Sequence, residues 1–475
     1  MSKTIITRFS PSPTGFLHIG GLRTALYSYL FAKKQQGQFL LRIEDTDQAR
    51  KVEGAIESLQ VVLKKFDLNW DNKKLMIQSE RLAIYQKYAG QLVKEGEAYY
   101  CFCTPERLEQ LKTVQIAKKL APMYDGKCRD LSLAEAENNI KSGRPYVIRF
   151  KMPKTGLTEF IDLIRGQVSF DNKTLDDQII LKSDGFPTYH LASVVDDHEM
   201  KISHVIRGEE WLPSTPKHIL LYQAFGWPIP KFAHLPLLLN SDRSKLSKRQ
   251  GDVAVEDYLS KGYLTEAILN FILLLGWNPG TDQEIFSLAE MIKTFTLEKV
   301  NKAGAIFDIQ KLDWLNGHYI RQKSDKELAK LCQPFFEASN IKTDLKYLEK
   351  VVATEKNRIK KLEDMVLATE FFFKSPNYDK GLLILKNLTE KEITNNLKLL
   401  AEQLEKISEK NWQKENLEQI ITGWIKEINK GVGDLLWPLR VALSGKKASP
   451  GPFEIAEALG KKESLARIQT AINLL

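Results

Sequence analysis

Strands and helices alternate at the beginning of the chain, and this alternation limits the fold more than any other feature of the sequence. Residues 4–9 have the β-branched composition of a strand, and residues 21–34 place apolar side chains on one side of a helix. Residues 38–43 predict a second strand and residues 53–66 a second helix. This order is typical of a parallel sheet covered by helices, so the sequence predicts an α/β fold.

The alternation is interrupted and then resumes. From about residue 85 the chain holds helices, a cysteine-rich segment and β-rich stretches, which together predict an inserted domain. Phe186 to Ala192 and Ile202 to Ile206 are predicted strands, residues 214–225 are a predicted helix, and His234 to Leu239 continue the pattern. The second half of the parallel sheet is therefore expected there. Beyond Tyr319 only helical spacing remains.

Bulk composition is that of a folded chain of several domains. Of 475 residues, 43% are hydrophobic and 27% are charged, which are ordinary globular proportions. Lys and Arg exceed Asp and Glu by 69 to 60, an excess that permits a polyanionic partner but fits an incidentally basic protein equally well. Neither a signal-peptide pattern nor an apolar stretch of about 18 residues is found, so we expect a cytoplasmic protein that does not bind membranes.

The turn between the first strand and the first helix has a composition suited to phosphate. Residues 11–21 read PSPTGFLHIGG. Gly20 and Gly21 leave no Cβ between the backbone and a ligand, the helix start offers N–H groups, and His18 can donate a hydrogen bond to a phosphate oxygen. The alternative is a Gly/Pro turn in which the histidine only caps the helix.

A basic segment follows an apolar run later in the chain. Residues 244–249 read SKLSKR. A loop with two lysines, Lys245 and Lys248, can close over a triphosphate and neutralise the charge that develops as pyrophosphate leaves. Alone, such a loop is more often solvated surface. Its pairing with the His18 segment favours the phosphate role.

These two segments resemble the signatures of a known enzyme class. His18 to Gly21 is similar to the HIGH signature, and Lys245 to Arg249 to the KMSKS signature, of class I aminoacyl-tRNA synthetases. The resemblance narrows to the glutamyl-tRNA synthetases through motifs spread over nearly the whole chain, at residues 8–15, 42–47, 187–192, 205–211, 307–312, 314–317, 437–440 and 442–445. It implies a ligase that activates glutamate with ATP and transfers it to a tRNA.

The resemblance also implies how ATP is held. The implied catalytic residues are His18, Lys245 and Lys248, which would contact the phosphates as the adenylate forms. ATP with Mg²⁺ is the implied co-substrate. Its implied binding residues are Ser12, Thr14, Gly15, His18, Gly20, Gly21, Leu237, Lys245, Ser247 and Lys248.

Glutamate itself determines what a selective pocket must contain. It carries two carboxylates and one ammonium, so the pocket needs a fixed guanidinium, an acceptor for the ammonium and hydroxyl donors. The motifs supply this set as Arg8, Ser10, Glu44, Tyr189 and Arg207. We expect Arg8 to bind the side-chain carboxylate, with Arg207 as the second candidate, and Glu44 to bind the ammonium. The alternatives are a surface ion-pair run at residues 42–47 and a core role for Tyr189.

Domain order and partners follow from the same resemblance. It implies a Rossmann-like catalytic domain in two halves, residues 1–84 and 187–240, separated by an inserted acceptor-stem-binding domain, residues 85–186. A stem-contact domain at residues 241–324 and two helical anticodon-binding subdomains at residues 325–385 and 386–475 would follow. The expected partners of the monomer are the glutamate tRNA and, as an open alternative, the glutamine tRNA. Two alternative functions are disfavoured by the sequence. A small-molecule nucleotidylyltransferase would not need the C-terminal helices, and a non-catalytic tRNA-binding protein would not need His18 and Lys248.

Three of the four cysteines cluster in the predicted insertion. Cys101 and Cys103 are followed by Cys128, a spacing that brings ligands together in structural zinc sites. Some bacterial members of the family carry zinc here with His as the last ligand, and this chain offers Asp130 instead, with Tyr124 nearby. The cluster is predicted either to hold a structural Zn²⁺ or to be three buried thiols.

Overall fold

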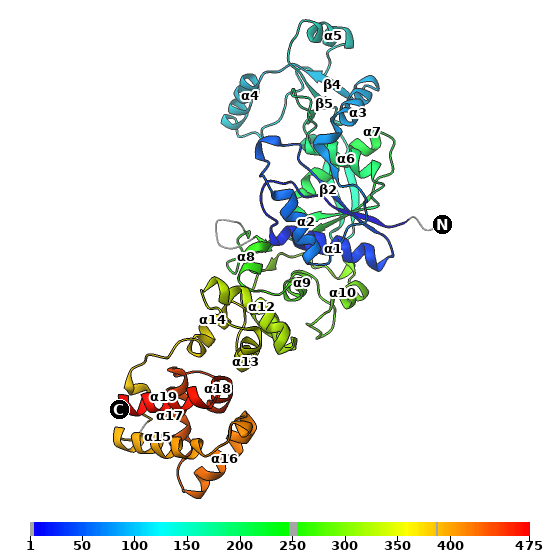
Figure 1. The fold of residues 1–475 in the computed structure, drawn as a ribbon. Helices are drawn as coiled ribbons and strands as arrows, with labels where there is room; N and C mark the ends of the chain where they lie inside the picture. The colour runs from blue at the N-terminus through cyan, green and yellow to red at the C-terminus, as the bar shows by residue number, and fades with distance from the viewer. Residues whose placement is uncertain (1–3, 247–253, 386–387) are drawn as a thin grey trace. The chain divides into compact units, whose positions relative to one another are not determined.

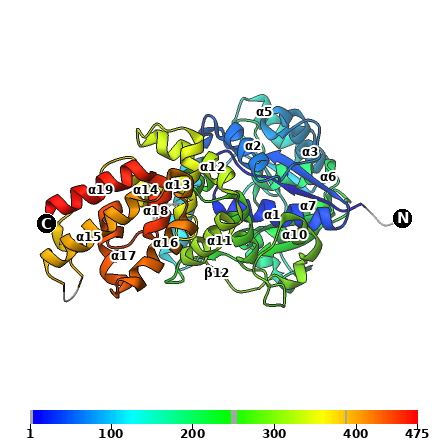
Figure 2. The same ribbon diagram turned by 60° about the horizontal axis from the view of Figure 1, so that its bottom comes forward.

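A computed structural model of the chain describes residues 4–246, 254–385 and 388–475. The chain divides into two compact units, drawn from two directions in Figures 1 and 2. Unit 1 comprises Met1–Tyr258 and Ile268–Ile309, and unit 2 comprises Leu259–Ala267 and Gln310–Leu475. The six predicted domains are a finer division, and their boundaries stay a prediction.

A parallel sheet forms the centre of unit 1. β1 (Ile6–Phe9), β2 (Gln38–Ile43) and β3 (Met76–Ile77) pair in parallel, as do β9 (His204–Gly208) and β10 (Lys231–Leu235). The backbone N–H of Ser203 donates to the carbonyl of Ile6 at 2.9 Å, so β9 lies beside β1 and joins the two halves. The predicted α/β fold with a parallel sheet is confirmed.

The first helix packs closely on the sheet. α1 (Ile19–Lys34) buries Leu22, Leu26 and Leu30, and it also lies against α10 (Leu288–Thr294) (Figure 2). A Cβ on Gly21 would lie only 2.9 Å from Cδ1 of Leu17, so a side chain there would push the helix start away from the preceding loop.

The other elements of this unit are α2 (Ala55–Lys65), α7 (Thr215–Ala224), β11 (Leu238–Leu239) and β12 (Ala305–Ile306). Two further helices, α8 (Val255–Ser260) and α9 (Thr265–Leu274), span the boundaries between the two units.

The predicted strand at Phe186 to Ala192 is wrong. Only its beginning is extended, where Pro187 forms an isolated β-bridge with Leu181, and α6 (Tyr189–Glu199) starts directly after Thr188. α6 is buried without a break from Leu191 to Asp197, so it lacks the polar face by which a helix is recognised in sequence. The predicted segment also contains only the first four residues of α6, Tyr189 to Ala192, which are too few to show a helical period.

The inserted segment forms a sheet of its own. β4 (Ala98–Cys101), β5 (Val147–Phe150) and β8 (Ile179–Leu181) pair antiparallel, and α3 (Leu82–Lys94), α4 (Pro105–Ala117) and α5 (Leu133–Lys141) accompany them (Figure 1). The hairpin of β6 (Leu157–Asp162) and β7 (Gly166–Asp171) comes from the same stretch of sequence but pairs with the central sheet, where Asp162 lies opposite Phe232 of β10. Asp162 is thereby brought to the centre of unit 1.

The described residues of unit 2 are helical beyond Tyr319, as the sequence predicts. The helices are α11 (Ile309–Gln322), α12 (Asp325–Ala338), α13 (Leu345–Glu355), α14 (Asp364–Thr369), α15 (Glu390–Glu405), α16 (Lys414–Glu427), α17 (Val432–Ser444), α18 (Pro452–Leu459) and α19 (Lys461–Leu474). Trp412 is buried in an apolar core to which α13 and α15 to α19 contribute, and it donates its indole N–H to the carbonyl of Ala456 at 2.8 Å. Among the helices that the structure describes, none is long and apolar enough to cross a bilayer.

Candidate active site

A pocket of about 540 Å³ opens where β1, β2 and β9 end. Parallel sheets place ligand sites at this edge because the loops after the strands meet there. The residues predicted for glutamate all line the pocket, as do some of those predicted for ATP; they are Arg8, Ser10, Glu44, Tyr189 and Arg207, and Ser12, Thr14, Gly20 and Gly21. The fold therefore collects most of the predicted site from segments far apart in the sequence.

His18 caps α1, the helix that borders this pocket. Its Nδ1 accepts a hydrogen bond from the backbone N–H of Gly20 at 2.9 Å. A neutral imidazole that accepts through Nδ1 carries its proton on Nε2, which is the nitrogen predicted to donate to a phosphate oxygen. The capping role is confirmed. It is compatible with the phosphate contact, which stays a prediction.

The other predicted ATP residues are not part of this lining. Gly15, Leu237 and Lys245 are described but do not line the pocket. Ser247 and Lys248 lie outside the described residues.

The segments on either side of residues 247–253 lie near the start of α1. On one side of residues 247–253, the N–H of Leu246 donates to the carbonyl of Leu238 at 2.9 Å, and the Leu238 side chain lies against Gly20. On the other side, the N–H of Val255 donates to the carbonyl of Leu17 at 2.9 Å. One flank of residues 247–253 is therefore bonded to Leu17 just before α1, and the other to β11, whose Leu238 lies against Gly20.

Two buried arginines share one carboxylate behind the pocket wall. Arg8 donates from Nε to Oδ1 of Asp197 at 3.0 Å, and Arg42 donates from Nη1 to the same oxygen at 2.7 Å. Burial raises the pKa of Asp197, but the two arginines outweigh burial and hold this pKa below its ordinary value. Asp197 is therefore ionised at neutral pH, and it fixes Arg8 before any ligand arrives.

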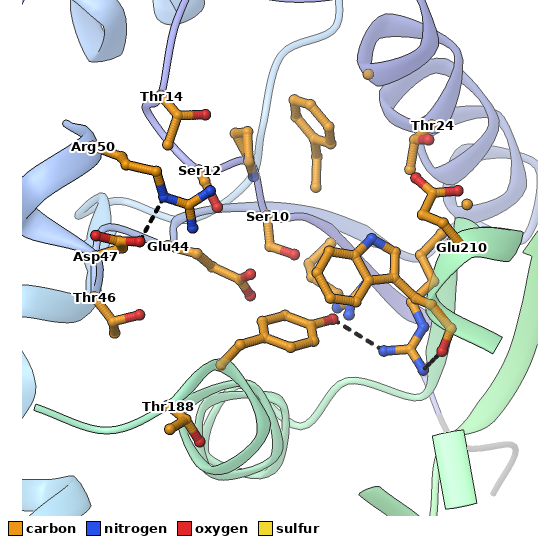
Figure 3. A pocket seen from close by; sticks show the side chains of 18 of the residues that line it. Ser10, Ser12, Thr14, Thr24, Glu44, Thr46, Asp47, Arg50, Thr188 and Glu210 are labelled. Atoms are coloured by element: carbon orange, nitrogen blue, oxygen red, sulfur yellow. Dashed lines mark hydrogen bonds and ion pairs between the residues drawn. The ribbon is translucent and has the colours of Figure 1, made fainter. Parts of the chain in front are cut away.

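Glu44 presents one carboxylate oxygen to the pocket. Its Oε1 accepts from Nη2 of Arg42 at 2.8 Å, whereas no donor within the described residues reaches its Oε2. Figure 3 shows Glu44 and Ser10 pointing into the same space. Burial raises the pKa of Glu44 in spite of Arg42. A cation beside Oε2 would offset the cost of burying the charged carboxylate, so the geometry suits the ammonium of an amino acid.

Arg207 has a different environment from Arg8. Its guanidinium donates to neutral acceptors, among them the hydroxyl of Tyr189 at 3.1 Å. No carboxylate in the part of the chain that the structure describes lies within 4.0 Å of it. Arg8 is thus neutralised by a carboxylate, whereas the charge of Arg207 is not neutralised by any described carboxylate.

Sequence reasoning missed several residues of this site. The pocket wall also includes Phe9, Pro11, Thr24, Thr46, Asp47, Arg50, Lys182, Thr188, Glu210 and Trp211. Arg50 and Asp47 pair at 2.6 Å at its exposed edge (Figure 3). Asp197 was missed as well, although an acidic pair within the apolar run of α6 is a sequence signal of buried ion pairing.

The three predicted cysteine ligands lie together. The Sγ atoms of Cys101, Cys103 and Cys128 lie within 4.8 Å of one another, with 3.7 Å between Cys103 and Cys128. The hydroxyl of Tyr124 lies 3.3 Å from Sγ of Cys101 and 3.5 Å from Sγ of Cys103. Asp130 is exposed and does not belong to the cluster. The structure therefore brings Tyr124, and not Asp130, to the three thiols.

Comparison with known proteins agrees with the fold. The family model described as "tRNA synthetases class I (E and Q), catalytic domain" matches residues 4–314, and one described as "Anticodon binding domain" matches residues 327–472. A glutamate–tRNA ligase of Clostridium tetani is 47% identical over 99% of this chain and 98% of its own, and one of Clostridium botulinum (strain Eklund 17B) is 46% identical over 100% and 99%. The chain belongs to the glutamate–tRNA ligase family.

Solved structures of this family have the same fold over the whole chain. A glutamate–tRNA ligase from Elizabethkingia meningosepticum, described as in complex with its amino acid, is 37% identical with a TM-score of 0.92 and 100% coverage of both chains. A glutamate–tRNA synthetase from Elizabethkingia anophelis is 37% identical with a TM-score of 0.89, covering 99% of this chain and 100% of its own. The α/β fold and the helical C-terminal region are thus those of glutamate–tRNA ligases.

The two roles of His18 can be separated by two substitutions. Asn is a good N-cap, so His18→Asn should keep α1 capped while removing the Nε2 donor. We expect it to lower glutamate-dependent ATP–pyrophosphate exchange by roughly 10²-fold, as for the loss of one donor to developing charge, with an unchanged melting temperature. His18→Ala should lose the same activity and also about 1 kcal/mol of stability. Exchange at the normal rate in His18→Asn would show that the histidine only caps the helix.

Proposed function

We propose that the chain is a glutamate–tRNA ligase that forms glutamyl-adenylate from L-glutamate and ATP and then esterifies the 3′-terminal adenosine of the glutamate tRNA, releasing AMP and pyrophosphate. One observation carries this proposal. A single pocket pairs an acceptor for an ammonium, Glu44, with a guanidinium that no described carboxylate neutralises, Arg207, beside the capped start of α1. An amino acid with a second carboxylate needs both groups.

The contacts of the two arginines favour Arg207 for the side-chain carboxylate. Arg8, the first choice from the sequence, donates two of its N–H groups to Asp197 at 3.0 and 3.3 Å. Arg207 meets only neutral groups. Because the hydroxyl of Tyr189 accepts from Arg207, its own proton is directed elsewhere and suits a carboxylate oxygen of the substrate. Ser10 adds a second hydroxyl, and Glu44 takes the ammonium.

ATP is proposed to bind with its phosphates at the start of α1. The α-carboxylate of glutamate attacks the α-phosphorus of ATP, the bond to the bridging oxygen breaks, and pyrophosphate leaves. His18, Lys245 and Lys248 stabilise the charge that develops on the phosphates, and Mg²⁺ bound with ATP supplies further positive charge. Positioning and electrostatics are enough for this step, so no side-chain nucleophile is needed.

Unit 2 is proposed to hold the tRNA anticodon. The match to an anticodon-binding domain and the helical fold of residues 327–472 support this role. Anticodon bases are unstacked and can be read by side chains without taking part in the chemistry. We propose that the protein is a cytoplasmic monomer and that its partner is the glutamate tRNA. The glutamine tRNA is the alternative partner, and the assay below includes it.

A charging assay tests this function directly. The purified protein should attach glutamate, and not glutamine, to the glutamate tRNA in the presence of ATP. Arg207→Gln removes the charge but keeps a polar side chain, and it should raise KM for glutamate roughly 30-fold or more with little change in KM for ATP, because truncating a buried charge contact costs about 2–5 kcal/mol. The proposal would be contradicted if the protein attached glutamate to neither the glutamate tRNA nor the glutamine tRNA.

We also propose a structural Zn²⁺ at the cysteine cluster, held by Cys101, Cys103 and Cys128. Zinc bound tetrahedrally at about 2.3 Å from each sulfur places the sulfurs about 3.8 Å apart, close to the 3.7 Å between Cys103 and Cys128. Burial raises the pKa of Cys103 to about 11, a cost to its thiolate that a bound cation would remove. The hydroxyl of Tyr124 is the proposed fourth ligand, in place of Asp130.

Metal analysis of protein prepared without added metal checks this proposal. We expect close to one zinc per chain, little zinc in Cys128→Ser, reduced zinc in Tyr124→Phe and unchanged zinc in Asp130→Asn. Traces of zinc in the unaltered protein would favour three buried thiols. Loss of zinc in Asp130→Asn but not in Tyr124→Phe would restore Asp130 as the fourth ligand.

A further inference from the structure

The guanidinium of Arg207 is enclosed by acceptors that carry no charge. Its Nε donates to Nε2 of His234 at 3.1 Å. Its Nη2 donates to the hydroxyl of Thr215 at 2.9 Å and to the carbonyl of Trp211 at 3.3 Å. Its Nη1 donates to the hydroxyl of Tyr189 at 3.1 Å and to one more histidine. The five N–H groups of Arg207 therefore have five neutral acceptors.

Two histidines are held as acceptors because their other ring nitrogens donate. An arginine can only donate, so Nε2 of His234 and Nδ1 of His218, which lies 3.3 Å away, must both accept. The proton of His234 is then on Nδ1 and is donated to Asp162 at 2.6 Å, and that of His218 is on Nε2 and is donated to His190 at 3.1 Å. Burial lowers the pKa of His218 far below its ordinary value, and it also lowers the pKa of His234 although Asp162 opposes this. Both rings are neutral at pH 7.

Neighbouring arginines of the same unit are held differently. Arg8 is fixed by Asp197, and Arg165 donates to Glu209. In each case a single carboxylate both orients the guanidinium group and neutralises its charge. Burying a cation without a counter-charge is unfavourable, so the surrounding scaffold holds Arg207 in place at the expense of stability. Such an arrangement is useful where a ligand brings the missing negative charge.

We propose that Thr215, His218 and His234 are positioning residues for glutamate recognition, which orient Arg207 through neutral acceptors so that its charge stays available to the side-chain carboxylate of the substrate. This inference rests on the proposed function and deepens it. A carboxylate in place of one of these acceptors would hold the guanidinium equally well but cancel its charge. Selectivity for glutamate over the neutral glutamine would then fall.

Matched pairs of substitutions isolate charge from hydrogen bonding. Asn and Asp have the same shape and differ in charge, so Thr215→Asn is compared with Thr215→Asp, and His218→Asn with His218→Asp. Thr215 is the first residue of α7, where the helix dipole favours Asp, so Thr215→Asp is expected to fold. Thr215→Ser keeps the hydroxyl and serves as the conservative variant.

Each Asp variant should raise KM for glutamate at least about tenfold over its Asn partner, as expected when an opposing charge is cancelled. The value of kcat at saturating glutamate and KM for ATP should stay similar within each pair, and inhibition by glutamine relative to glutamate should increase in the Asp variants. Thr215→Ser should behave like the unaltered enzyme. Equal KM values for glutamate within both pairs would overturn the inference.

A measurement on the unaltered enzyme covers the case in which the Asp variants fail to fold, as judged by thermal melting. In ¹⁵N NMR spectra of protein labelled at histidine, Nδ1 of His218 and Nε2 of His234 should be unprotonated at pH 7. A proton on either nitrogen would overturn the inference. Unaltered enzyme that does not charge tRNA with glutamate would instead overturn the proposed function, so the two failures are distinguishable.

Discussion

The carboxylate of Asp197 is the group on which the arrangement of the site depends. It lies on α6 and accepts hydrogen bonds from Arg8 of β1 and Arg42 of β2, so one buried anion connects a helix to two neighbouring strands at the pocket wall. Arg42 in turn holds Glu44, whose second oxygen faces the pocket. Breaking a buried ion pair of this kind costs about 3–5 kcal/mol because the remaining charges lose their partner. The same contacts therefore stabilise unit 1 and orient the proposed ammonium site.

Arg8 and Arg207 show how one pocket can divide structural and recognition roles between two arginines. Arg8 is neutralised by Asp197, and its hydrogen bonds contribute to the stability of the sheet. Arg207 is oriented by Thr215, His218 and other neutral groups, and its charge remains without a described counter-ion. Electrostatic attraction is strong in a buried site, so a charge that is left uncompensated there can discriminate between a carboxylate and an amide.

Much of the fold and the part of the pocket proposed for glutamate could be predicted from sequence, because motifs such as those around Arg8 and Glu44 lie at strand ends, where a parallel sheet places its ligands. The roles of Thr215, His218 and His234 in holding Arg207 could not, because they arise only when α7, β10 and the β6–β7 hairpin come together. The strand wrongly predicted at residues 186–192 has a different cause, since this segment contains only the first four residues of α6 and shows no helical period. The position of Asp130 next to the Cys128 segment suggested it as the fourth zinc ligand, whereas the fold leaves Asp130 exposed and brings Tyr124 to the thiols.

The central claim is that the uncompensated charge of Arg207 meets the side-chain carboxylate of glutamate. A crystal structure of the protein with bound L-glutamate tests it most directly. We predict that this carboxylate lies beside Arg207 within hydrogen-bonding distance of the Tyr189 hydroxyl, that the ammonium contacts Glu44, and that Arg8 remains paired with Asp197. A complex in which Arg8 leaves Asp197 to bind the side-chain carboxylate, with Arg207 remote from the ligand, would contradict the account.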